Sequence, residues 1–386
     1  MRLKGITMII RSLMGGGAER VMSTMANHWV AQGVSVTIIT SIDPDLDAYS
    51  LDSRVKRVWL KPTDSFLSKF GFPWHIRSLR NAIKNEGHEM VVSFMDRTNI
   101  PVILSTRRMG VKVVIAERID PRTQGYGRFK KMLMRMCYPC ADAVSVLTHN
   151  VKQEWAEHFL PARKVHVIHN PVLPLCTDEK CIPDWLPEKF MCCMGRLHPQ
   201  KGFDILLDLL PKVFTKYPDY SLVILGEGEN RKDLEEQAER LGIADRVFMP
   251  GFIKNPHAII QKSSLFVFPS RFEGFPNALV ESMALGLPVV SFDCPSGPGY
   301  LIESGYNGLL APLEDSKALL DGIEYMLGHP EEARKMGAGA KKIRKKCNPD
   351  LVMGMWTNLL EAVLEENSHF VQEDSPFINA CQEFLE

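Results

Sequence analysis

The chain has 386 residues, with 45% hydrophobic and 24% charged residues. This length suggests two domains, and the composition is that of a soluble globular protein rather than a disordered one. No apolar run reaches the roughly 18 residues that a membrane-spanning helix needs, so an integral membrane protein is not expected.

The overall net charge of zero hides an uneven distribution. Residues 1–170 contain 25 Lys and Arg against 14 Asp and Glu, a net of +11, and the remainder contains 21 against 32, a net of −11. The two halves either attract one another or the basic half offers a surface to an anionic partner.

The first residues, MRLKGITMIIRSLM, form a strand rather than an export signal. Arg11 interrupts the apolar segment after five residues, and no small-residue cleavage site follows. With no export signal, the nine cysteines are expected to be reduced thiols of a cytoplasmic protein. Cys137 and Cys140 form a C-x-x-C pair, but a zinc site would need a second pair.

Three glycines follow the first strand, in LMGGGAERVM at 13–22. A dinucleotide fingerprint would require another glycine where Arg20 stands, so this match is weak. The helix N-terminus and Arg20 instead suit a phosphate. The following segment DPDLD, at 43–47, contains two D-x-D patterns, which we interpret as a solvated loop rather than a metal site.

Strand-like and helix-like segments alternate along both halves. The strand-like runs are ITMII, VSVTIIT, VKRVWL, MVVSFM, VKVVIA, AVSVL and VHVI in the first half, and FMCCMG, SLVILG, RVFMPG, SLFVFPS, LPVVSFD and NGLLAP in the second. The strand-like runs are continuously apolar, which indicates parallel sheets covered on both faces. A proline-rich stretch after residue 170 interrupts the series. We therefore predict two doubly wound α/β domains facing each other across a cleft. The predicted boundaries are 1–170, 171–366 with a last helix that crosses back to the first domain, and a tail, 367–386.

The most informative segment is SSLFVFPSRFEGFPNALVESMALGLPVVSF, at 263–292. Glu273 lies in the loop after a strand, and Glu281 lies inside the helix that begins near Asn277. Carboxylates so placed accept hydrogen bonds from paired sugar hydroxyls, while the helix N-terminus suits a phosphate. The alternative is two surface glutamates favoured by the helix dipole.

The chain resembles the retaining family 4 glycosyltransferases of GT-B fold. Glu273 and Glu281 match the E-x7-E motif of that family. Further matching segments are MGRLHPQKGFDILL, LVILGEGE, GYNGLLAP, GGGAERV and IHNPV. The resemblance implies a nucleoside-diphosphate-sugar donor, with UDP as the expected nucleotide, and neither a cofactor nor a metal.

The resemblance also implies roles for individual residues, with Arg196, Lys201 and Glu273 as the expected catalytic residues. Arg196 and Lys201 resemble the basic pair that grips the donor diphosphate, and cations there oppose the charge that builds on the leaving nucleotide. Glu273 corresponds to the acid that holds the hexose hydroxyls, and Glu281 to the acid that binds the ribose. Further donor contacts are expected at Gly226, Glu227, Gly274, Phe275, Pro276, Asn277 and Ala278, and at Gly15, Gly16 and Gly17 of the first domain.

The sequence departs from many relatives after the fifth strand, where Glu117 is followed by Arg118 instead of histidine. An arginine does not shuttle protons at neutral pH, but it can hold a phosphate or a hydroxyl. Asp96 and Arg97, at the end of the fourth strand, are further acceptor contacts expected from their position alone.

We therefore predict a metal-independent hexosyltransferase that transfers a hexose or N-acetylhexosamine to a glycan or lipid-linked saccharide in cell-surface polysaccharide assembly. The alternatives are a GT-B nucleotide-sugar epimerase and a non-catalytic sugar-nucleotide binding protein. No nucleic-acid partner is expected.

Two segments of the basic half predict peripheral attachment to an anionic membrane on the cytoplasmic side. Segment 66–84 combines aromatic residues with Lys69, Arg77, Arg80 and Lys84, and segment 126–138 combines Phe129, Leu133 and Met136 with Arg128, Lys130, Lys131 and Arg135. The alternative is that both are ordinary helices whose apolar faces pack on the sheet.

Overall fold

The computed structural model describes residues 2–14, 16–61, 72–172 and 175–365. The chain divides into two compact units. The first comprises the described residues of 1–171 and those from Pro349 onward, and the second comprises the described residues of 172–348.

The first unit contains a seven-stranded parallel sheet in the order β3-β2-β1-β4-β5-β6-β7. Its strands are β1 (Gly5–Ile9), β2 (Ser35–Thr40), β3 (Lys56–Trp59), β4 (Met90–Phe94), β5 (Lys112–Ala116), β6 (Ala143–Val146) and β7 (Val165–Val167). The strand order reverses between β1 and β4, which is the position where doubly wound sheets bind ligands. All seven apolar runs expected in this half form strands.

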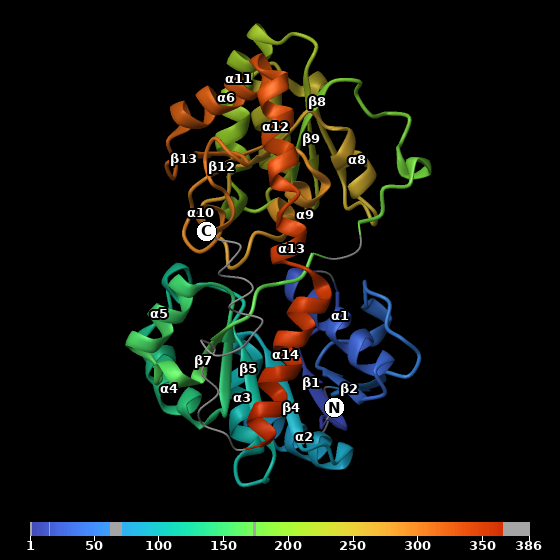
Figure 1. The fold of residues 1–386 in the computed structure, drawn as a ribbon, viewed down its shortest axis with the longest axis vertical. Helices are drawn as coiled ribbons and strands as arrows, with labels where there is room; N and C mark the ends of the chain where they lie inside the picture. Colours follow the sequence, from blue (N-terminus) through green and yellow to red (C-terminus); the bar gives the residue numbers. More distant parts are fainter. Residues whose placement is uncertain (1, 15, 62–71, 173–174, 366–386) are drawn as a thin grey trace. The chain divides into compact units, whose positions relative to one another are not determined.

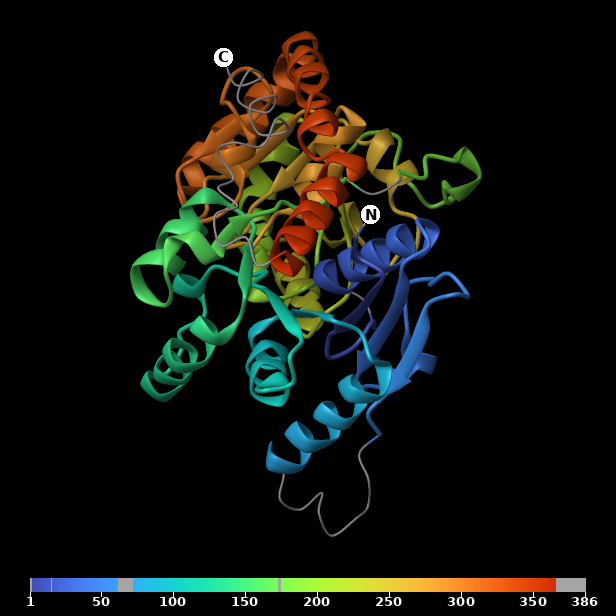
Figure 2. The same ribbon diagram turned by 60° about the horizontal axis from the view of Figure 1, so that its bottom comes forward.

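Helices cover both faces of this sheet, as Figures 1 and 2 show. One face packs against α1 (Gly17–Ala31) and α14 (Pro349–Leu364). The other packs against α2 (Phe72–Glu86), α3 (Asp96–Thr106), α4 (Arg128–Cys137) and α5 (His149–His158). Successive strand residues point to opposite faces, so Met8 joins the first core and Ile9 the second.

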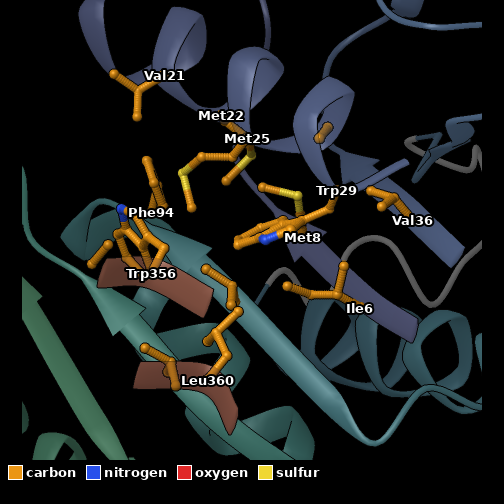
Figure 3. Packing of buried hydrophobic residues seen from close by; sticks show 14 of the residues in the cluster. Ile6, Met8, Val21, Met22, Met25, Trp29, Val36, Phe94, Trp356 and Leu360 are labelled. Atoms are coloured by element: carbon orange, nitrogen blue, oxygen red, sulfur yellow. The ribbon is translucent and has the colours of Figure 1, made fainter. Parts of the chain in front are cut away.

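Helix α14 completes the first of these two cores. Trp356 stacks near Phe94, with ring centroids 6.0 Å apart, and Figure 3 shows the pair within the same cluster as Met25 and Trp29. The Trp29 Nε1–H donates to Thr357 Oγ1 at 3.1 Å. Because these contacts are with the first sheet, α14 belongs to the first unit, and the second unit ends at Asn348.

The second unit contains a six-stranded parallel sheet in the order β10-β9-β8-β11-β12-β13. Its strands are β8 (Phe190–Met194), β9 (Ser221–Leu225), β10 (Val247–Gly251), β11 (Leu265–Phe268), β12 (Val289–Phe292) and β13 (Leu309–Ala311). All six apolar runs expected in this half form strands, so the prediction of two parallel α/β sheets is confirmed.

Some helices of the second unit contribute to its main hydrophobic core, and others lie outside that core. Helices α6 (Phe203–Lys216), α7 (Arg231–Arg240), α11 (Ser316–Gly328) and α12 (Pro330–Ala340) bury their apolar residues in one core with the strands. Helix α9 (Asn277–Leu285) contacts β11 and β12 and packs with α8 (His257–Lys262). The short helices are α10 (Pro298–Leu301) and α13 (Ile343–Lys346).

Candidate active site

An ion pair joins two of the predicted catalytic residues in the second unit. The Lys201 Nζ donates to Glu273 Oε1 at 2.6 Å, and only 17% of the lysine side chain and 6% of the glutamate side chain are exposed. Lys201 ends a turn after β8, and Glu273 lies in the loop between β11 and α9. Since β8 and β11 are neighbours, their following loops meet at the carboxyl edge of the sheet.

Side chains that the sequence reasoning missed tie these two loops together. Arg271 donates its N–H to the Gln200 carbonyl at 2.8 Å, and the Gln200 amide donates to the Phe272 carbonyl at 2.8 Å. The Arg271 guanidinium also makes two 2.8 Å bonds to the Asp204 carboxylate. These bonds fix the distance between Lys201 and Glu273. The one signal in the sequence for these contacts was an arginine, Arg271, two residues before the motif glutamate Glu273.

Glycines permit close backbone approaches beside this pair. Gly202 has φ +65°, and a Cβ there would lie 2.0 Å from the Pro269 carbonyl oxygen. Gly226, a predicted donor contact, has φ +148°, and a Cβ there would lie 2.0 Å from the Gly195 carbonyl oxygen. Both positions therefore require glycine.

The amino end of α9 follows Glu273 directly. Gly274, Phe275, Pro276, Asn277 and Ala278 form this turn, and Pro276 at the N-cap gives no side-chain hydrogen bond to the first turn. The amide groups of a helix's first turn lack intrahelical partners, so this end suits an anion. The amino end of α9 thus follows Glu273 of the lysine–glutamate pair directly, at the position where the resemblance predicts donor contacts.

The second motif glutamate has a histidine partner that the sequence reasoning also missed. Glu281 lies in α9 with 6% of its side chain exposed, and its Oε2 is 3.1 Å from His257 Nε2. His257 is 3% exposed and begins α8. Glu281 is therefore a buried, partnered carboxylate, which argues against the alternative of a surface glutamate favoured by the helix dipole.

Two further predicted donor contacts lie on the surface. Arg196 follows β8 and is exposed. The exposed Glu227 carboxylate is engaged by the Arg231 guanidinium, whose Nε lies 2.9 Å from Glu227 Oε2, and this hydrogen bond lowers the pKa of the glutamate. The Glu227 carbonyl accepts the Leu197 N–H at 2.9 Å, which joins the loops after β8 and β9.

In the first unit, the glycine loop leads from β1 into α1. Gly17 begins α1, and Gly16 lies at its N-cap without a capping side chain. The Gly16 N–H donates to the Tyr49 hydroxyl at 3.2 Å. Gly15 lies outside the described residues. Each unit thus has a helix amino terminus among its predicted donor contacts.

Asp96 begins α3 and is paired with a cation. Its carboxylate accepts a hydrogen bond from Lys130, whose Nζ also lies 4.2 Å from the Tyr126 ring centroid. The preceding residue, Met95, has φ +74°, a conformation that is strained for a non-glycine residue and that recurs at functional sites. Asp96 is therefore held at the carboxyl end of β4.

Glu117 belongs to a buried hydrogen-bond network with Asp96 nearby. Its Oε1 accepts the Tyr138 hydroxyl and the Asn99 amide, the latter at 2.7 Å. Ser93 in turn donates to Asn99 at 2.7 Å. Burial, together with the negative charge of Asp96, raises the pKa of Glu117 to about 7, against the weaker lowering effect of the Tyr138 and Asn99 hydrogen bonds.

Arg118 points to the opposite face of the sheet from Glu117. Its guanidinium lies 4.4 Å from the Phe94 ring centroid and 5.2 Å from that of Trp356 in α14, and the residue is only 6% exposed. Nη1 donates to the Ile168 carbonyl at 3.4 Å. The structure therefore places the side chains of these two adjacent predicted acceptor residues in different surroundings.

The raised pKa of Glu117 predicts a pH-dependent stability. Burial penalises ionisation of the Glu117 carboxyl only in the folded state. The protonated carboxyl therefore contributes to the free energy of unfolding, and this contribution is lost as pH rises from about 4.5 through about 7. Relative to wild type, Glu117→Gln should gain up to about 3 kcal/mol of unfolding free energy between pH 4.5 and 8. Urea unfolding across this range measures the difference. The exposed Glu89→Gln is the control, and parallel curves for Glu117→Gln and wild type would contradict the assignment.

Arg97 follows Asp96 in α3, but its side chain points in a different direction around the helix axis. It lines a cavity of about 230 Å³ beside the ends of β1, β2 and β3, together with residues of α2 such as His75 and Leu79. Of the four predicted acceptor residues, the structure thus brings together only Asp96 and Glu117.

The D-x-D loop has structural partners. The Asp43 side chain accepts the Asp45 N–H at 3.1 Å, and Asp47 pairs with Arg57 at 2.9 Å. Among the described residues, no group of three or more His, Cys, Asp or Glu is arranged to hold a metal ion.

Helix α4 presents large apolar and cationic side chains to solvent. Phe129, Met132 and Met136 are 72%, 49% and 66% exposed. Arg128, Lys131 and Arg135 are exposed on the same helix. We call these six residues the α4 surface. Lys130, which the sequence grouped with them, instead pairs with Asp96.

The other predicted membrane segment is less available. Its residues 66–71, including Lys69, lie outside the described residues, and Arg80 donates to the Ser105 and Arg107 carbonyls. Across the described ranges of the chain, none of the helices combines the length and apolar character needed to cross a bilayer.

Solved structures identify the fold. Anabaena HepE in complex with UDP and glucose aligns with a TM-score of 0.80 at 16% identity, covering 93% of this chain and 99% of that one. Together with the two parallel α/β sheets, this likeness defines a protein of GT-B fold.

The sequence comparisons identify the family. Residues 15–173 match the model "Glycosyltransferase Family 4", and residues 183–343 match "Glycosyl transferases group 1". The chain belongs to these GT-B glycosyltransferases, as its motifs indicated.

Two relatives come from Campylobacter jejuni. One is N-acetylgalactosamine-N,N'-diacetylbacillosaminyl-diphospho-undecaprenol 4-alpha-N-acetylgalactosaminyltransferase, 27% identical over 89% of this chain and 96% of its own. The other is GalNAc-alpha-(1->4)-GalNAc-alpha-(1->3)-diNAcBac-PP-undecaprenol alpha-1,4-N-acetyl-D-galactosaminyltransferase, 28% identical over 93% of this chain and 98% of its own.

Proposed function

We propose that this glycosyltransferase is a retaining, metal-independent enzyme that transfers a hexose or N-acetylhexosamine from a UDP-sugar to a lipid-linked saccharide in polysaccharide assembly. The observation that carries the proposal is the Lys201–Glu273 pair beside the amino end of α9, with the buried Glu281 four residues into that helix. Relatives that act on undecaprenol-diphosphate-linked saccharides support the choice of acceptor.

The donor would be held through its charges and hydroxyls. Lys201 and the first amides of α9 neutralise the diphosphate, with Arg196 available from the loop after β8. Glu273 and Glu281 accept hydrogen bonds from sugar and ribose hydroxyls respectively. As the bond from the anomeric carbon to the diphosphate breaks, negative charge grows on the leaving oxygen, where the lysine and the helix end stabilise it. In this proposal the lysine and the helix end take the part that a metal ion would otherwise play.

The acceptor would approach residues of the first unit. Asp96, which is paired with Lys130, and Glu117 are the two acidic groups that follow β4 and β5. We propose that Asp96 accepts a hydrogen bond from an acceptor hydroxyl, while Glu117 maintains the position of α3 through Asn99.

The decisive experiment combines a donor panel with product stereochemistry. UDP-hexoses and UDP-N-acetylhexosamines are incubated with enzyme and an undecaprenyl-diphosphate-linked saccharide, with EDTA present, and the new anomeric linkage is identified by NMR. Transfer with retention is expected. An inverted linkage, loss of turnover with EDTA, or donor epimerisation without transfer would contradict the proposal.

Donor binding gives a separate prediction for Glu281. Hydrogen bonds to charged groups contribute about 1.5–3 kcal/mol, so Glu281→Ala should weaken UDP binding about 10- to 100-fold. Isothermal titration calorimetry measures the change, and the exposed Glu229→Ala of the same unit is the control. Unchanged UDP affinity in a folded Glu281→Ala protein would remove this glutamate from the donor site.

We also propose that the α4 surface docks on anionic lipid. Each cation near such a surface contributes on the order of 1 kcal/mol, and exposed aromatic and methionine side chains can enter the headgroup region. Arg128→Glu with Lys131→Glu should therefore weaken binding to anionic vesicles about 30-fold or more at low salt.

Co-sedimentation with phosphatidylglycerol vesicles tests this proposal. The charge-matched control is Lys4→Glu with Arg163→Glu, which changes exposed residues of the same unit. Equal loss in both double variants would indicate a general charge effect, and no binding of the wild type would exclude the α4 surface as a membrane site.

A further inference from the structure

His257 connects Glu281 to the segment that precedes β8 in the second unit. Its Nε2 lies 3.1 Å from Glu281 Oε2, and its Nδ1 lies 3.1 Å from the backbone nitrogen of Cys176. Both His257 and Glu281 are at least 95% buried. The three residues come from α8, α9 and the segment before β8.

These two bonds determine where the ring carries its proton. A backbone N–H can only donate, so Nδ1 must be the acceptor of the Cys176 bond. A neutral ring then carries its proton on Nε2, which points at the Glu281 carboxylate and donates to it. The main chain at Cys176 therefore selects the tautomer that stabilises ionised Glu281.

We infer that His257 is a positioning residue for recognition of the nucleotide ribose. The inference rests on the proposed function, in which Glu281 accepts the ribose hydroxyls. A hydrogen bond from a buried ring to one carboxylate oxygen fixes the rotation of that carboxylate, and a fixed acceptor binds a pair of hydroxyls better than a rotating one. His257 itself need not touch the donor.

Two substitutions test the two hydrogen bonds of His257 separately. The amide of His257→Gln places an N–H near the position of Nε2, so it can still donate to Glu281. The amide of His257→Asn reaches only the position of Nδ1, so it can keep the Cys176 bond but not the Glu281 bond. Both replacements are polar and smaller than histidine, which makes them a matched pair.

The readout is the ratio of the Kd values of UDP and 2',3'-dideoxy-UDP, measured by calorimetry. Wild type should prefer UDP by about 10- to 100-fold, the expected effect of hydrogen bonds to a charged acceptor. His257→Asn should lose most of this preference while binding dideoxy-UDP as wild type does, and His257→Gln should retain it. Because both nucleotides are compared on one protein, partial unfolding does not alter the ratio.

The other outcomes overturn the inference in distinguishable ways. If His257→Asn weakens the binding of both nucleotides equally, or changes neither affinity, His257 only supports the fold. The assignment of the donor site then still stands. If His257→Gln loses the preference as completely as His257→Asn, the Nε2 bond is not the cause. If wild type does not discriminate between the nucleotides, the ribose role of Glu281 fails and the inference fails with it.

Discussion

Replacing Lys201 by methionine should lower kcat about 10²- to 10³-fold at saturating donor, the usual effect of removing one group that stabilises developing negative charge. The lysine is held against Glu273 at 2.6 Å in a largely buried pair, so its charge is positioned before the reaction begins. A smaller effect is expected on KM, because the amides of α9 still bind the diphosphate.

Removing the lysine alone leaves Glu273 buried without its partner, which destabilises the fold. The double variant Lys201→Met with Glu273→Gln removes both charges and separates this effect from catalysis. Lys189→Met, which breaks an exposed pair with Asp219, is the control. A folded Lys201→Met enzyme with kcat within threefold of wild type would exclude the lysine from leaving-group stabilisation.

The largest stability effect is expected at Gly202. An alanine there must adopt φ +65° and would place its Cβ 2.0 Å from the Pro269 carbonyl oxygen, so backbone has to move. We expect Gly202→Ala to lower the free energy of unfolding by about 3–5 kcal/mol, which is at the upper end for single substitutions. Displacement of Pro269 would also shift the loop that carries Glu273 and reduce activity.

Gly242 provides a close control for that substitution. Its φ is +68°, and a Cβ there would meet nothing within 4 Å. Gly242→Ala should therefore cost only the backbone strain, about 1 kcal/mol. Urea unfolding of the two variants isolates the cost of the close approach, and equal losses would show that backbone conformation alone matters at Gly202.

The fold could be predicted because it depends on local patterns. Thirteen apolar runs, separated by helical segments and by glycine or proline, correspond to the strands of the two sheets. The motif spacing likewise placed Glu273 before α9 and Glu281 within it. These features can be predicted without knowing which strands become neighbours in a sheet.

The rest of the site depends on such neighbours. Arg271 and Gln200 meet because β8 and β11 pair across about 70 residues of sequence, and His257 meets Glu281 because α8 packs on α9. The opposite directions of Glu117 and Arg118 follow from strand alternation, but their partners come from α4's end and from α14. Sequence spacing alone did not reveal these partners.

The late position of α14 in the chain has a consequence for synthesis on the ribosome. The apolar face that receives Trp356 is made early, yet the helix that covers it follows the whole of the second unit. At roughly 5–20 residues per second, translation of residues 172–348 takes on the order of 10 s or more. During that interval the nascent first unit exposes an uncovered hydrophobic surface. The first hydrophobic core is therefore completed only after the second unit has been synthesised.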